Sequence, residues 1–398
     1  MNTLAAITPA RMALIGVGWF GYQAFWAFHG GPMPLFLRGF TDSKFTISLV
    51  LSLAGVAGCL VPPVVGYLSD RTATRFGRRK PYIFCGFLGV FLCIVGLPHV
   101  GAFWSVALLA GVMYFALRSA EIPYLSLLPD VTPPEQRSTA SGVMNLVGSF
   151  GLIACFTVSS ALWDDHPDTV FYLVALAAFG SVVLAIAFIR EPAVPQEGAR
   201  KIAGPLAYLR SVAEESNALR YYIAQFLWWI GFWMISSFAT LFVVEELQVA
   251  EGKSFLVLMT FSLSATVFAL PLGMLGDHFD RKRLLSISVA SWAVIQIIVG
   301  LSQNLTQALI TVGISAIPFA AVIGVGYAFM LDLVPRQRTA EFVGFSTISI
   351  AAAQIIGPLI GGQLIDTFGY RSMFPASAAF MFAGFLVLQL VRPGAKAP

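Results

Sequence analysis

The sequence predicts an all-α membrane protein with twelve transmembrane helices in two pseudo-symmetric six-helix bundles. Hydrophobic residues make up 58% of the 398 residues and charged residues only 11%, whereas ordinary soluble domains contain about 25% charged residues. The apolar runs are continuous and close to the roughly 20 residues that cross a hydrocarbon core as a helix. They lack the apolar–polar alternation over about 10 residues that strands of a membrane barrel require.

The apolar runs divide into twelve predicted spans with mostly short loops between them. These spans cover residues 12–37, 45–68, 81–98, 102–128, 138–162, 169–189, 219–244, 254–276, 284–302, 306–331, 341–365 and 370–391. The longest connection, residues 190–218, contains prolines and glycines and separates two sets of six spans. We therefore predict an N-terminal bundle over 1–189, a cytoplasmic central loop over 190–218 and a C-terminal bundle over 219–398.

Basic residues are distributed unequally between the two predicted sides of the membrane. Of the 24 basic residues, only Arg38, Lys44, Lys253 and Arg371 fall in loops on one side, Arg118 lies within a span, and the rest fall on the other side. Because basic loops stay in the cytoplasm, both termini are expected to be cytoplasmic. The expected location is the plasma membrane or a bacterial inner membrane, and the net charge of +4 reflects this topology and gives no indication of a nucleic-acid partner.

The sequence contains no pattern typical of an enzyme. The four cysteines lie inside apolar runs without the spacing of metal ligands or of a disulfide framework; they are Cys59, Cys85, Cys93 and Cys155. No nucleophile constellation or nucleotide-binding loop occurs in the sequence. We therefore expect a protein that is not an enzyme and that uses no cofactor and no metal.

Two motifs occur once in each half of the chain. A dense basic turn at 66–80 joins the second and third spans, and a degenerate copy lies at 273–283. The segment 128–137 leaves the fourth span, and the segment 331–338 leaves the tenth with acid, proline, Gln and Arg in the same order. Repeated motifs at equivalent places indicate two six-span repeats related by an axis along the membrane normal.

The basic turn resembles the signature loop of the major facilitator superfamily. Its form, Ser69-Asp70-Arg71 followed by Phe76-Gly77-Arg78-Arg79-Lys80-Pro81-Tyr82, is similar to that of sucrose-transporter-like sugar–proton symporters and of glycoside–pentoside–hexuronide cation symporters. The segment 121–130 is similar to the fourth span of the latter group. The resemblance implies a carrier that works by alternating access and moves a sugar or glycoside with a cation.

Charged residues of the two basic turns are candidates for a conformational latch. Asp70 lies at the end of the second span, where a carboxylate can cap a helix or pair with an arginine of another span. A surface ion pair of modest strength suits a contact that has to break during transport. We predict a cytoplasmic latch that comprises Asp70, Arg71, Arg78, Arg79, Asp277 and Arg281. The alternative is that the basic residues only enforce topology.

Arg118 and Glu121 form an ionisable pair well inside the fourth predicted span. They are three residues apart and therefore share one helical face. Charges inside a membrane are costly, so both side chains are expected to face a cavity or each other. A carboxyl group withdrawn from water holds a proton more readily, so we predict that Glu121 couples transport to protons. Arg118 would be its partner or a donor to the solute, and the alternative is a purely structural ion pair.

The resemblance supports this role for Glu121 but not a sodium site. In the glycoside–pentoside–hexuronide group, the position that matches Glu121 holds an acid of the cation and substrate site. Sodium-coupled members have further acids in the first and second spans, and here neither the first span nor residues 45–65 contain one. Protons are therefore the expected coupling ion.

Aromatic and amide side chains within the spans are candidates for solute binding. Sugar sites combine aromatic surfaces with well-placed polar groups. The candidates are Tyr22, Gln23, Trp26, His29, Asn145, Gln225, Trp229 and Gln354. Two alternatives remain open: tryptophans often face lipid, and a lone histidine in a span is often a structural group.

The predicted function is secondary active transport of a small polar solute by proton-coupled alternating access, with a sugar or glycoside as the first choice. The expected partners are the solute, protons and the lipid bilayer, and the chain is expected to act as a monomer. One alternative is a proton-coupled exporter of an amphiphilic drug or metabolite. Another is an assembly or sensing protein of transporter descent that moves nothing.

Overall fold

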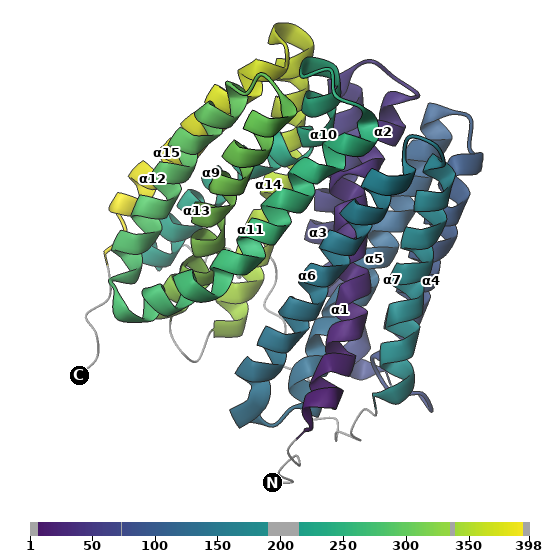
Figure 1. Cartoon of the computed structure of the whole chain (residues 1–398). Helices are drawn as coiled ribbons and strands as arrows, with labels where there is room; N and C mark the ends of the chain where they lie inside the picture. Colours follow the sequence, from purple (N-terminus) through teal and green to yellow (C-terminus); the bar gives the residue numbers. More distant parts are fainter. Residues whose placement is uncertain (1–6, 73, 190–214, 335–338, 393–398) are drawn as a thin grey trace. The chain divides into compact units, whose positions relative to one another are not determined.

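The computed structural model describes residues 7–72, 74–189, 215–334 and 339–392, and all regular structure within these ranges is helical (Figure 1). Most of the predicted central loop, residues 190–214, lies outside the described residues. The chain forms two compact units. Unit 1 consists of Met1–Asp42, Val56–Glu197 and Ala250–Met259, and unit 2 consists of Ser43–Gly55, Gly198–Val249 and Thr260–Pro398.

Unit 1 is a helix bundle built mainly from the N-terminal half of the chain, in purple to teal in Figure 1. Its helices are α1 (Pro9–Gly30), α2 (Pro32–Arg38), most of α3 (Lys44–Arg71), α4 (Lys80–Gly96), α5 (Phe103–Val131), α6 (Arg137–Leu162) and α7 (Pro167–Phe188). Two short 3₁₀ helices, Leu97–His99 and Pro134–Gln136, lie in the connections. Within the unit, α1 packs against α6 and α7, and α4 packs against α5 and α7.

Unit 2 is a second bundle, built mainly from the C-terminal half, in green to yellow in Figure 1. Its helices are α9 (Ser216–Ser236), α10 (Ala239–Leu241), the π-helix η3 (Phe242–Glu246), most of α11 (Glu251–His278), α12 (Arg281–Gly300), α13 (Leu305–Asp332), α14 (Thr339–Phe368), the 3₁₀ helix Tyr370–Ser372 and α15 (Met373–Gln389). In this unit α9 packs against α14 and α15, and α12 packs against α13 and α15.

The two bundles share one packing scheme. The first span of each half packs against the fifth and sixth, and the third packs against the fourth and sixth. The same four contacts in both bundles support the internal duplication that the repeated motifs predict.

The second span of each half belongs to both units. The first part of α3, within Ser43–Gly55, belongs to unit 2 although it follows α2 of unit 1. The first part of α11, within Ala250–Met259, belongs to unit 1 although it follows η3 of unit 2. Each half therefore provides the start of its second span to the unit of the other half.

Hydrophobic length identifies most of the predicted spans. Within the described residues, ten helices are long and apolar enough to cross a membrane, and α9 with α10 and η3 gives an eleventh that bends by 42°. Helix α1 has 22 residues but is not among them. It contains Tyr22, Gln23, Trp26 and His29, whose polar atoms lower its hydropathy.

The first predicted span is broken, which the sequence prediction of one segment over 12–37 missed. Helix α1 ends at Gly30, and α2 begins at Pro32 after Gly31. Because Pro32 has no backbone N–H, it suits the first position of a new helix better than the interior of a long one. The equivalent span of the other half, predicted as 219–244, also breaks, after Ser236.

Close contact between α1 and α6 depends on small residues. Gly151 lies on α6, and a Cβ atom added to it would lie only 2.1 Å from the backbone oxygen of Phe20 on α1. Gly142 lies on the same helix, and nothing lies within 4 Å of its Cβ position. Small residues at helix contacts let membrane helices approach closely, so Gly151 fixes the distance between α1 and α6.

We predict that Gly151→Ala destabilises the protein by about 1–3 kcal/mol, because the added methyl group must displace the α1 backbone. Gly142→Ala is the matched control on α6 and should be neutral or slightly stabilising, because alanine favours a helix. Thermal unfolding of both variants in detergent tests this. Equal melting temperatures for the two variants would contradict a close α1–α6 contact at Gly151.

Candidate functional site

Two helices of unit 1 present side chains at the same i, i+4, i+7 spacing. On α1 these are Tyr22, Trp26 and His29, and on α5 they are Tyr114, Arg118 and Glu121. They meet in antiparallel order, so the first residue of one set contacts the last residue of the other. We call these six residues the α1–α5 ladder.

The first rung of the α1–α5 ladder joins a tyrosine, a carboxylate and an arginine. The Tyr22 hydroxyl donates to Oε1 of Glu121, and Nη1 of Arg118 donates to Oε2 of the same carboxylate at 2.7 Å. The side chains of Arg118 and Glu121 are 10% and 13% exposed. Both oxygens of Glu121 therefore have a partner, as a carboxylate withdrawn from water requires.

The second rung places the Arg118 guanidinium against an aromatic face. Its central carbon lies 4.8 Å from the centre of the Trp26 ring. A cation over an indole ring is stabilised by the electron density of that face. Trp26 also packs edge-on against Tyr22 at 6.2 Å, so the tryptophan contacts both partners of the carboxylate.

The third rung is a histidine–tyrosine pair. Nδ1 of His29 lies 2.8 Å from the Tyr114 hydroxyl, and both side chains are buried. The two rings are also nearly perpendicular at 5.2 Å. The prediction of His29 as a solute ligand is untested, and the structure gives it a partner within the protein.

Tyr114 was not among the predicted site residues, although the sequence contained a signal for it. It lies four residues before Arg118 and seven before Glu121, on the helical face that those two residues define. Extending the face that Arg118 and Glu121 define by one turn towards the start of α5 includes Tyr114.

The remaining predicted binding residues do not join the α1–α5 ladder. On α6, the Asn145 amide donates to the Ser141 carbonyl of its own helix and is exposed. Gln23 is half-buried on α1 and makes no hydrogen bond to any residue that the structure describes. In unit 2, Gln225 accepts a hydrogen bond from the Ser346 hydroxyl at 2.9 Å, and Gln354 is 1% exposed.

Unit 2 contains an aromatic cluster around α9. The Phe232 ring stacks on Phe319 at 5.2 Å and also contacts Trp229 at 5.2 Å. Phe319 contacts Trp292 and Phe261 at 5.5 and 4.8 Å. Trp229, one of the predicted binding residues, therefore belongs to this aromatic cluster, and it is 8% exposed.

Two of the predicted latch residues of unit 1, Arg78 and Arg79, form ion pairs within that unit. Arg79 donates to Asp130 at 2.6 Å and Arg78 donates to the same carboxylate at 2.9 Å. These contacts join the start of α4 to the end of α5. Arg71 lies over the Tyr67 ring at 3.6 Å, and the side chain of Asp70 lies outside the described part of the chain.

The corresponding contact recurs in unit 2. Arg281, at the start of α12, pairs with Asp332 at 2.9 Å and with Asp277 at 3.3 Å. The pairs Arg79–Asp130 and Arg281–Asp332 both join residues 51 positions apart. In each half, the repeated basic turn therefore forms an ion pair with the repeated acidic segment that leaves the fourth span of that half. The latch predicted from the sequence did not include the two acids, Asp130 and Asp332. A role of the latch between the two bundles stays a prediction.

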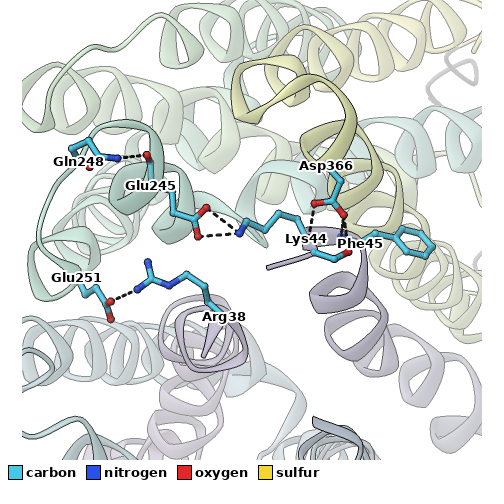
Figure 2. Close-up of polar contacts among 8 residues, drawn as sticks. Arg38, Lys44, Phe45, Glu245, Gln248, Glu251 and Asp366 are labelled. Atoms are coloured by element: carbon cyan, nitrogen blue, oxygen red, sulfur yellow. Dashed lines mark hydrogen bonds and ion pairs between the residues drawn. The ribbon is translucent and has the colours of Figure 1, made fainter. Parts of the chain in front are cut away.

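A second set of polar contacts joins the first span of one half to the second span of the other (Figure 2). In unit 1, Arg38 at the end of α2 pairs with Glu251 at the start of α11. Trp163 donates from its indole N–H to the other oxygen of Glu251 at 2.6 Å. The backbone N–H of Gly252 donates to Asp164 at 2.8 Å. The start of α11 is thus held by α2 and by the end of α6.

Unit 2 contains the reciprocal contact, also visible in Figure 2. Lys44, at the start of α3, pairs with Glu245 of η3 at 2.9 Å. Asp366 of α14 accepts backbone N–H groups of Lys44 and Phe45 at 2.7 and 3.0 Å. The carboxylate therefore satisfies donors that a helix start leaves without intrahelical partners. We call Arg38–Glu251 and Lys44–Glu245, with Asp366, the reciprocal clasp.

The reciprocal clasp contains basic residues whose positions in the sequence indicated only topology. Arg38 and Lys44 belong to the small group on the predicted outer side, and a third member, Arg371, pairs with Glu246 at 2.7 Å. The Arg38 and Lys44 pairs depend on acids that lie about 200 residues away, so no local sequence signal identifies them.

The described residues contain no group of three His, Cys, Asp or Glu side chains that could hold a metal ion. The polar groups of the α1–α5 ladder bind one another, and an arginine, a carboxylate and a histidine among aromatic rings form no hydrolytic constellation. The arrangement places one carboxylate, one guanidinium and one imidazole among aromatic rings inside unit 1.

Two helix bundles of matching packing, with a charged network inside a span, are the architecture of a membrane carrier that moves small solutes. The model of the Major Facilitator Superfamily matches residues 15–250 and 221–398. The chain belongs to this superfamily, which confirms the twelve-helix fold class and the prediction that the protein is not an enzyme.

Curated relatives include proteins named as multidrug transporters. The multidrug resistance protein MdtG of Proteus mirabilis is 30% identical over 169 residues, which is 41% of each chain. The multi-drug resistance efflux pump PmrA of Streptococcus pneumoniae is 24% identical over 362 residues, which is 87% of each chain. The chain thus aligns with less than half of the first protein and with most of the second.

Solved structures confirm the fold. A mutant of the nucleoside transporter NupG matches with a TM-score of 0.79 and 13% identity over 96% of this chain and 99% of that one. A bacterial homolog of the lysosomal transporter Spinster matches with a TM-score of 0.78 and 15% identity over 98% and 100%. At such identities the likeness concerns the fold alone.

We predict that Arg118→Gln destabilises the protein by about 3–5 kcal/mol, because it leaves the buried Glu121 carboxylate without its ion-pair partner. The double variant Arg118→Gln/Glu121→Gln should recover much of this loss, because no buried charge is then uncompensated. Unfolding of the single and double variants in detergent, read as a double-mutant cycle, tests the pair. Additive losses would show that the two side chains do not interact.

Proposed function

We propose that the protein is a proton-coupled exporter of a small amphiphilic solute, with Glu121 as the carboxyl group that exchanges the proton. The observation that supports this proposal is the first rung of the α1–α5 ladder. Glu121 is the acid of a buried network in which Tyr22 and Arg118 each donate to one of its oxygens.

Protonation of Glu121 changes the network in a defined way. A carboxylate attracts the Arg118 guanidinium at 2.7 Å, and a neutral carboxyl group does so far less. The Tyr22 hydroxyl can either donate to a carboxylate or accept from a protonated carboxyl group. The Trp26 ring stabilises the Arg118 cation in both states. The proton therefore decides whether Arg118 is held by the acid or is available to another group.

The character of the described side chains favours an amphiphilic solute over a sugar. A sugar needs several free donors and acceptors, because each unpaired polar group in a buried site costs free energy. Here Tyr22, Glu121 and Arg118 bind one another, and Gln225 binds Ser346. The aromatic cluster of unit 2 offers mainly ring surface. The names of MdtG and PmrA, both multidrug proteins, support the same class.

The sugar–proton symport prediction rests on the resemblance of two segments, 66–82 and 121–130, and on the aromatic residues of the spans. It differs from export of an amphiphile in solute and in direction. Both proposals use the same carboxyl group, so the experiment below separates them by the solute and not by the proton.

The reciprocal clasp supports alternating access as the mechanism. The starts of α3 and α11 each belong to the unit of the other half. A carrier that rocks its two halves has to release these segments once in each cycle. The Lys44–Glu245 pair joins a buried lysine to a glutamate that is 28% exposed, so water can reach one partner when the pair breaks.

We predict that Glu121→Gln abolishes proton-driven movement of the solute while the protein still folds, because the amide cannot exchange a proton but keeps the shape of the side chain. Glu135→Gln, an exposed carboxylate of the same unit, is the matched control and should behave like the wild type. The measurement uses purified protein in sealed vesicles with a pH dye inside.

In that assay, amphiphilic cations and a panel of mono- and disaccharides are added one at a time. Proton flux driven by an amphiphile and absent in Glu121→Gln supports the proposal. Flux driven by a sugar would instead favour symport. If Glu121→Gln moved protons with a solute as the wild type does, the assignment of the coupling carboxyl group would be wrong.

We predict that Lys44→Gln shifts the equilibrium between the states of the carrier by about fivefold or more, because an ion pair with a buried lysine costs more to lose than the roughly 1 kcal/mol of a surface pair. Lys253→Gln removes an exposed basic residue near the start of α11 and serves as the control. Spin labels at the exposed positions Asp165 and Gln303 report the distance distribution. An unchanged distribution in Lys44→Gln would exclude a gating role for the clasp.

A further inference from the structure

An open groove runs along the surface of unit 2 between α12 and α15. Its volume is about 650 Å³. Polar residues line one end, at the start of α12, and the rest is lined by mainly apolar residues together with Ser291. The groove has a polar end and a mainly apolar end, and it is open along its length. It is therefore neither an enclosed path for a solute nor a contact filled by another helix.

The polar end of the groove contains two basic side chains with different roles. Nζ of Lys282 donates to the carbonyl oxygens of Gln389 and Val391 at 2.9 and 2.7 Å, so it caps the end of α15. The guanidinium of Arg283 makes no hydrogen bond or ion pair with any residue in the described ranges, and the residue is exposed. Asp280 caps α12 by accepting the backbone N–H of Arg283 at 2.7 Å.

These contacts make the polar end attractive to an anion. Lys282 and Arg283 with Asp280 give a net charge of +1, and the positive end of the α12 dipole adds to it. The Asp280 carboxylate is already used by the helix cap. Arg283 is therefore the group with free hydrogen-bond donors.

The apolar end follows one face of α12. Ile287 and Val294 are 58% and 59% exposed, and Ala290 lies between them with a small side chain. Phe385 of α15 forms the opposite wall. From Arg283 to Val294 the helix rises by about 16 Å over eleven residues, close to half of a hydrocarbon core about 30 Å thick. The groove is therefore about as long as one leaflet is deep.

We propose that this groove binds an anionic phospholipid, with the phosphate at Arg283 and one acyl chain along Ala290 and Val294 against Phe385. The span that includes α12 begins at Arg281, so Arg283 lies at the level of the headgroups. A basic residue there attracts anionic lipids, and the exposed apolar face below it accepts the chain. A free anion would use the polar end only, and a soluble partner would not explain an apolar face at membrane depth.

The test uses two photoactivatable lipids with a diazirine at the middle of the same acyl chain, one a phosphatidylglycerol and one a phosphatidylcholine. The purified full chain is placed in phosphatidylcholine nanodiscs that contain a small fraction of either probe, and labelled residues are found by mass spectrometry. We expect the anionic probe to label α12 and α15 at the groove about fivefold more than the zwitterionic one.

Two variants separate headgroup recognition from acyl-chain binding. Arg283→Gln should remove the preference for the anionic probe, whereas Lys253→Gln, the matched loss of a basic residue in the first turn of α11, should preserve it. Ala290→Trp fills the groove and should suppress labelling by both probes, whereas Ile298→Trp, on the same helix but outside the groove, should not.

Equal labelling by the two headgroups, or a preference that survives Arg283→Gln, would overturn the proposal. So would unchanged labelling in Ala290→Trp, because the chain would then lie elsewhere. The groove shares no residue with the α1–α5 ladder, and the labelling assay uses no transported solute. These outcomes therefore do not depend on the proposed solute or on Glu121.

Discussion

The burial of Arg118 and Glu121 within α5 is the constraint on which the site depends. Charges inside a membrane-spanning helix are tolerated only when other groups compensate them. Here α1 provides this compensation with the Tyr22 hydroxyl and the Trp26 ring. Helix α1, which contains these residues, is not among the ten described helices that are apolar enough by themselves to cross a membrane, and neither is α9.

The internal duplication explains the second level of organisation. Both halves use the same helix packing and the same arginine–aspartate contact between the third and fourth spans. The two halves differ in where charge lies within the bundle. The α1–α5 ladder has a charged rung, whereas the aromatic cluster around Phe232 and Phe319 in unit 2 contains no ionised side chain. The two bundles thus share a scaffold and differ in the side chains of their interiors.

Much of the α1–α5 ladder was predictable because it depends on helical periodicity. Tyr22, Trp26, His29, Arg118 and Glu121 were all identified as membrane-depth polar or aromatic groups. Tyr114 was missed although it lies on the same face. The reciprocal clasp could not be predicted in this way, because Arg38 and Lys44 pair with acids in the other half of the chain. Local spacing contains no information about which distant helix ends meet.

The fold class, the spans and the repeat could be inferred from the sequence without any structure. They depend on the length of apolar runs and on the order of motifs, both local properties that a hydrocarbon environment makes decisive. The pairing of side chains required the folded chain. Folding matched the α1 and α5 faces in antiparallel order, joined Arg79 to Asp130 and Arg281 to Asp332, and exchanged the starts of α3 and α11 between the units. Such pairings depend on helix packing and register, which no single segment specifies.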